Sequence, residues 1–149
     1  MLLKKILFPT LLGTTAMTAF SYLVSKKKKR NFKEPKVLAQ MFERLPGGPD
    51  DDDGATAAGF GAHYLAGLLF AVPYVYLWEK EILQPDLPTG AALGAASGLA
   101  GIAGWELMFK LHPSPPPKNK KRYFGHLMLA HIVFGVFSAA GYRMAIRSN

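Results

Sequence analysis

Four long apolar stretches constrain the fold of this chain more than any other feature of its sequence. Each is long enough to cross the hydrocarbon core of a bilayer as a helix, which takes roughly 20 residues at about 1.5 Å each. Spanning strands are excluded because open sheet edges cannot lie in lipid. The sequence therefore predicts one all-α integral membrane domain over residues 1–149, a bundle of four transmembrane helices at residues 6–24, 57–78, 87–109 and 123–146.

The composition agrees with this class because charged and apolar residues are segregated along the chain. Half of the residues are hydrophobic, yet the net charge is +8. The absence of cysteine excludes disulfides, thiol catalysis, Cys-ligated zinc and iron–sulfur clusters. No nucleophile–base pair or phosphate-binding loop is recognisable either. These observations favour a protein that is not an enzyme.

The first apolar stretch has the basic start and apolar run of a secretory signal peptide. No small-x-small cleavage site precedes Ser25, and a basic block follows at once as a stop-transfer signal. We therefore expect this stretch to be retained as a membrane anchor.

Basic residues are distributed unevenly between the two sides of the predicted bundle. The loops at residues 25–56 and 110–122 contain thirteen Lys and Arg residues, whereas the opposite side contains five. Because loops rich in Lys and Arg stay in the cytoplasm, both of these loops are expected there. Both termini are then on the non-cytoplasmic side.

The first loop combines a basic block with a short amphipathic helix predicted at residues 35–45. The block should attract anionic lipid headgroups by about 1 kcal/mol per basic residue. The same block also explains the topology by itself, without specific lipid or partner recognition. Nucleic-acid binding is disfavoured because no aromatic residues are interleaved with the charges. The predicted headgroup contacts are Lys26, Lys27, Lys28, Lys29 and Arg30.

Small residues follow one face of the third predicted span. Lipid provides no hydrophobic drive for helix association, so small residues at spacings of three and four mark faces where helices approach closely. We predict a packing seam here, and a seam for a homo-oligomer or a larger membrane complex would look the same. The face consists of Gly90, Gly94, Gly98 and Gly101.

Spans two and four contain an internal repeat. Residues 62–74 align without gaps to residues 130–142, with five identities in thirteen positions. Both spans run in the same direction, so the repeat predicts a duplicated helix hairpin. It places His63 and His131 at similar depth in the membrane.

Ionisable side chains within membrane spans are costly and often functional, and four of those in the predicted spans are candidates for a site. His63 and His131 could ligate a transition metal or haem iron, relay protons, or simply hydrogen-bond between helices. Glu106 and His126 lie nearer the loops and are predicted as a second-shell or ion pair. The residues alone leave these alternatives open.

Short motifs in all four spans resemble a family of small four-helix bacterial inner-membrane proteins, the YagU-like proteins. The similar parts are the Gly-Thr-Thr-Ala-Met-Thr run at 13–18, His63-x3-Gly67, the glycine-rich third span and the run from His131 to Gly135. The resemblance implies a multi-pass protein of the bacterial inner membrane. It implies no activity and no catalytic residues.

The sequence therefore favours a non-enzymatic membrane protein, structural or an accessory subunit of a complex. The alternatives are a His-ligated metal or b-type haem protein and a small bundle that moves protons or solutes. A cofactor is not specified by the sequence.

Overall fold

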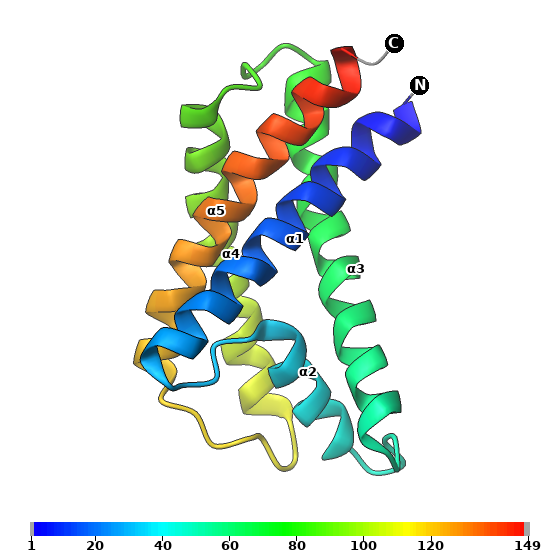
Figure 1. Ribbon diagram of the computed structural model, residues 1–149, viewed down its shortest axis with the longest axis vertical. Coiled ribbons are helices and arrows are strands. Elements are labelled where there is room, and N and C mark those ends of the chain that lie inside the picture. Colours follow the sequence, from blue (N-terminus) through cyan, green and yellow to red (C-terminus); the bar gives the residue numbers. More distant parts are fainter. Residues whose placement is uncertain (1, 148–149) are drawn as a thin grey trace.

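The computed structural model describes residues 2–147 and confirms the predicted all-α bundle (Figure 1). Four of its five helices are long and apolar enough to cross a membrane. The fifth, α2, is short and lies within the first loop. The helices are α1 (Leu2–Lys28), α2 (Glu34–Glu43), α3 (Asp52–Glu79), α4 (Leu87–Leu111) and α5 (Lys120–Arg147).

The long helices extend past the predicted apolar spans because charged residues continue and cap them. Basic residues end α1, where they complement the negative end of the helix dipole. Asp51 caps the start of α3 and accepts a hydrogen bond of 2.6 Å from the Gly54 backbone N–H. Asp86 begins α4 with a capping box, and the Thr89 backbone N–H, then the Thr89 hydroxyl, lower the pKa of the Asp86 carboxyl. Hydropathy alone cannot locate such ends.

The helices place the loops at two ends of the molecule. Both chain ends and the connection between α3 and α4 lie at one end, hereafter the termini end (Figure 1). The segment with α2 and the extended segment at residues 112–119 lie at the other, hereafter the loop end. The two loops with the most basic residues are therefore on the same side of the bundle.

The glycine face of α4 packs against α5, as predicted for a seam between helices. A Cβ at Gly90 would lie 2.6 Å from the Gly135 carbonyl oxygen, and one at Gly94 would lie 2.8 Å from the Cα of Ile132. Gly101 faces the ring of His131. A side chain at Gly90 or Gly94 would force the backbones of α4 and α5 apart.

Helix α1 crosses the bundle and contacts both α5 and α3 (Figure 1). Gly13 lies against Ser138 and the backbone of Phe134, so α1 and α5 approach closely. Gly67 of α3 lies directly against the hydroxyl of Thr14. Helix α1 thereby joins α3 to the pair formed by α4 and α5.

Helix α2 confirms the predicted amphipathic segment but begins at Glu34 and ends at Glu43. Its buried face packs on α3, where a Cβ at Gly59 would lie 2.8 Å from the Ala39 backbone nitrogen. Leu45, the last residue of the predicted helix, lies beyond the end of α2 and is exposed. Helix α2 is therefore fixed against the bundle at the loop end.

Substituting Gly135 by alanine should disrupt the seam between α4 and α5. The added Cβ would collide with the Gly90 carbonyl and lie 2.7 Å from the Gly94 nitrogen. We expect a loss of about 1–3 kcal/mol, typical of overpacking, seen as a lower melting temperature in detergent. The matched control is Gly125→Ala in the same helix, where a Cβ meets nothing within 4 Å. An equal loss in both variants would contradict the seam.

Candidate functional site

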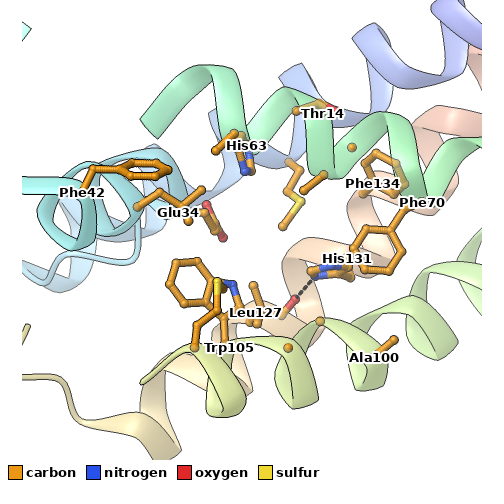
Figure 2. Close-up of a pocket in the computed structure, with 18 residues that line it drawn as sticks. Thr14, Glu34, Phe42, His63, Phe70, Ala100, Trp105, Leu127, His131 and Phe134 are labelled. Carbon is orange, nitrogen blue, oxygen red and sulfur yellow. Dashed lines mark hydrogen bonds between the residues drawn. The ribbon is translucent and has the colours of Figure 1, made fainter. Parts of the chain in front are cut away.

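A cavity of about 320 Å³ lies between α3 and α4, on the side of the bundle where these two helices diverge (Figure 2). Helix α3 packs on α1 and α2, whereas α4 packs on α5. Ala100, Gly104 and Met108 of α4 line the cavity and are also exposed on the surface of the bundle. The cavity therefore opens sideways, toward the region that lipid occupies around a membrane bundle.

The wall of the cavity is predominantly apolar. Phe70 of α3, Trp105 of α4 and Phe134 of α5 provide aromatic surface, and Phe42 closes it on the α2 side. Besides the indole of Trp105, only a few of the lining side chains carry polar groups: Thr14, Glu34, His63 and His131. An apolar wall with a few placed polar groups is typical of a small-molecule site.

Glu34 is the most unusual of these side chains, since it is 1% exposed. It stands in the first turn of α2, just before Pro35, where the helix dipole favours a negative charge. Its Oε1 accepts a 2.7 Å hydrogen bond from the Ser21 hydroxyl. Its buried Oε2 has no hydrogen-bond partner among residues 2–147. The carboxyl group points into the space between α3 and α4 (Figure 2).

Ser21 connects Glu34 to His126 at the loop end. The single hydroxyl proton of Ser21 goes to Glu34, so His126 Nε2 must donate its own proton to Ser21 Oγ across 2.9 Å. His126 Nε2 lies 3.6 Å from Glu34 Oε1, and its ring is stacked between Phe20 and Phe32. In a serine hydrolase the serine and the carboxylate contact different nitrogens of the histidine ring. Here Ser21 and Glu34 both lie near the same nitrogen, Nε2 of His126. Ser21, which is fully buried, is arranged here as a link and not as a nucleophile.

The hydrogen-bond network also fixes the tautomers of the two cavity histidines. The Thr18 hydroxyl donates to the Thr14 carbonyl at 2.7 Å, so His63 Nε2 must donate to Thr18 Oγ1 at 3.0 Å. His131 Nδ1 donates to the Leu127 carbonyl at 3.0 Å. In a neutral ring the second nitrogen then carries a lone pair. Each histidine thus keeps one hydrogen-bond acceptor: Nδ1 of His63 and Nε2 of His131.

The structure brings His63 and His131, the predicted site residues, onto the wall of a single cavity (Figure 2). Both are buried, at 6% and 5% exposure. Within residues 2–147, no group of three or more His, Asp or Glu side chains is placed to hold a metal ion. The hypothesis of a metal or haem held by these two histidines stays a prediction.

Glu106 and His126, predicted as a pair, are not brought together. Glu106 is exposed and forms an ion pair with Lys120 at 3.0 Å, whereas His126 is buried beside Glu34 and Ser21. The predicted headgroup residues 26–30 are exposed at the end of α1. The acidic partner of His126 therefore comes from α2 and not from α4.

The sequence repeat corresponds to equivalent places in the structure. Four of the five shared residues, the histidine, the glycine, the second alanine and the tyrosine, are buried in both copies, whereas the first alanine is buried only as Ala130. Gly67 packs on α1 and Gly135 packs on α4, so each repeated helix meets the long helix that precedes it in its own half of the chain. This arrangement agrees with a duplicated hairpin.

Glu34 was missed by the analysis of the sequence, although a signal for it exists. It precedes Val37 and Leu38 by three and four residues, so it shares the apolar face of the amphipathic helix. A carboxylate on that face is a buried polar group that needs partners. Extending the predicted helix by one residue would have identified it.

The extended segment at residues 112–119 is fastened to the loop end. His112 Nε2 hydrogen-bonds the Met41 carbonyl at 2.8 Å, and Arg44 Nη1 reaches the Pro115 carbonyl. Lys118 donates to the Asn31 carbonyl at 3.0 Å, and its partial burial lowers the pKa of its ammonium group. These contacts hold the end of α2 and close the loop end of the bundle.

Comparison with known protein families, curated proteins and solved structures finds no match. The resemblance to the YagU-like proteins therefore stays a prediction.

Removing the Ser21 hydroxyl should destabilise the fold at the loop end. Ser21→Ala leaves Glu34 Oε1 and His126 Nε2 without their shared partner in a buried site. An unsatisfied buried group costs about 1–3 kcal/mol, so we expect a lower melting temperature than for the wild type. Ser114→Ala is the control, because Ser114 is exposed in the 112–119 segment. A stable Ser21→Ala variant would show that the link contributes little.

Proposed function

We propose that this chain is a non-enzymatic, multi-pass membrane protein that binds a small lipid-phase molecule in the cavity between α3 and α4. The observation that carries the proposal is the lateral opening of a mostly apolar cavity in a bundle of apolar helices. Its volume of about 320 Å³ falls at the lower end of the range of ligand sites, roughly 300–1,000 Å³. A ligand could enter directly from the bilayer.

A buried polar atom of the wall supports a specific ligand over loosely packed lipid chains. Glu34 lines the cavity, and its Oε2 has no hydrogen-bond partner among the described residues. Acyl chains cannot supply one. Because an unsatisfied polar group in an apolar environment is costly, a ligand with a polar group would be bound more tightly than a hydrocarbon.

A binding role also accounts for the chemistry of the site better than catalysis does. The Ser21 proton is committed to Glu34, and Ser21 is shielded from the cavity by burial. The protein would then act by holding its ligand, alone or as an accessory subunit of a larger complex or homo-oligomer.

The second candidate function is binding of a metal or haem by His63 and His131. It is favoured by the free acceptor nitrogen on each ring. Metal analysis of the purified protein separates the two candidates.

For the orientation, we propose that the loop end faces the cytoplasm of a bacterial inner membrane. The support is the excess of basic residues in the two loops that share this end. The exposed block at residues 26–30 would then contact anionic headgroups of the inner leaflet.

Filling the cavity should abolish ligand binding. Ala100→Phe places a ring at the opening between α3 and α4. An alkane with bromine at one end should then no longer reach the wall of the cavity. Trp105 lines the cavity and Trp78 does not, which makes Trp105 fluorescence in a Trp78→Phe background a local readout of bromine quenching. We expect at least about a tenfold higher alkane concentration for half-quenching, which corresponds to about 1.4 kcal/mol.

Ala103→Phe is the matched control, since Ala103 is exposed on the same helix and does not line the cavity. It should leave quenching of Trp105 unchanged. Equal quenching in the Ala100→Phe and Ala103→Phe variants would contradict binding in the cavity.

The proposed orientation is testable with single cysteines, because the chain has none of its own. Ser114→Cys lies at the loop end and Glu81→Cys in the α3–α4 connection, and both positions are exposed. In intact bacterial cells with a permeabilised outer membrane, a membrane-impermeant maleimide should label Glu81→Cys alone. After lysis it should label both. Labelling of Ser114→Cys alone in intact cells would reverse the orientation.

A further inference from the structure

We propose that the cavity selects a molecule whose polar head donates hydrogen bonds, with a protonated long-chain amine as the best-matched class. This inference rests on the proposed function and specifies the chemistry of the ligand. It depends on which hydrogen-bonding groups the polar side chains of the wall leave free.

Glu34 supplies the strongest of these groups. Its carboxyl group points into the cavity, its Oε1 is engaged by Ser21, and its Oε2 is buried and unpartnered. An ionised carboxylate has acceptor sites only. A donor on the ligand would complete its hydrogen bonding, and a cationic donor would also compensate its charge. An anionic head would meet repulsion at the same place.

The two histidines reinforce this preference because their available groups are acceptors as well. His63 uses its N–H on Thr18, and His131 uses its N–H on Leu127. In the neutral form each ring can therefore only accept a further hydrogen bond. Three acceptors on one cavity wall favour a head with several donors, which an ammonium group provides and a carboxylate does not.

The surroundings of Glu34 suit an amphipathic cation with an apolar tail. Figure 2 shows Phe42 beside Glu34 on α2 and Trp105 opposite it on α4. Aromatic faces near a carboxylate attract cations by their quadrupoles. Phe70 and Phe134 extend the apolar wall away from Glu34. The head would lie at the α2 end of the cavity, and the tail would lie along α3 and α5.

Paired probes of equal chain length test the inference. Tail-brominated dodecylamine and tail-brominated dodecanoic acid are added to the Trp78→Phe protein in discs of zwitterionic lipid, with Trp105 quenching as the readout. A protein with Trp78 as its single tryptophan, made by Trp105→Phe, reports the bromine concentration outside the cavity and corrects for partitioning. We expect the amine to quench Trp105 at a concentration at least about tenfold lower than the acid, typical of a hydrogen bond to a charged group.

Glu34→Gln is the decisive variant because it removes the charge and keeps the size of the side chain. Its amide can still accept from Ser21, and the amine should lose its advantage over the acid. Glu34→Asp keeps the charge and should keep part of the preference. Should Glu34→Gln fail to fold, two measurements still decide the question. One is the preference for amine over acid in the Trp78→Phe protein with Glu34 intact, and the other is the change of that preference in Glu34→Asp.

The outcomes separate this inference from the proposed function. The amine and the acid could quench Trp105 equally in the Trp78→Phe protein, and Ala100→Phe could abolish the quenching by both. That result would overturn the selection of a donor head and leave binding in the cavity intact. Quenching by both probes that Ala100→Phe does not change would overturn both proposals. A preference for the amine that survives in Glu34→Gln would remove Glu34 as its source.

Discussion

Close backbone contact at glycine is the interaction on which the rest of this bundle depends. The Gly90, Gly94 and Gly135 contacts join α4 to α5, and the contact of Gly67 with Thr14 joins α3 to α1. In lipid such contacts must replace the hydrophobic drive, because the surroundings are as apolar as the helix surface. They also determine where packing is missing. With α3 held by α1 and α4 held by α5, the two helices diverge, and the lateral cavity lies between them.

Polar contacts complete what the glycine contacts begin. Helix α2 has a carboxylate on its inner face, and Ser21 and His126 from two different long helices receive it. The arrangement is specific in direction: His126 donates to Ser21, and Ser21 donates to Glu34. One carboxylate oxygen is therefore used for the fold. The other is buried without a partner among residues 2–147 in a side chain that lines the cavity, which joins the stability of the loop end to the chemistry of the proposed site.

The sequence predicts the fold of this chain better than its site. Helix number and type follow from apolar runs, and the seam of α4 follows from the spacing of Gly90, Gly94 and Gly98, because both are local periodic patterns. The repeat predicts equivalent positions for the two histidines, and both line the same cavity. The pairing of Glu106 with His126 was not found, since the partner of His126 depends on how α2 folds back into the bundle. A cavity between α3 and α4 has no local signal at all, because it depends on which helix faces remain unpacked.

The balance between apolar area and free acceptors is what distinguishes this cavity from an ordinary packing defect. A lipid chain could fill the space along Phe70 and Phe134 and gain dispersion contacts there. It would leave Glu34 Oε2 unsatisfied, and an unpaired carboxylate in an apolar environment is among the costliest groups a protein can bury. A molecule that combines a tail with a donor head satisfies both parts of the wall at once. The free energy gained at Glu34 is then available for selectivity, because hydrocarbon and anionic competitors for the same space cannot obtain it.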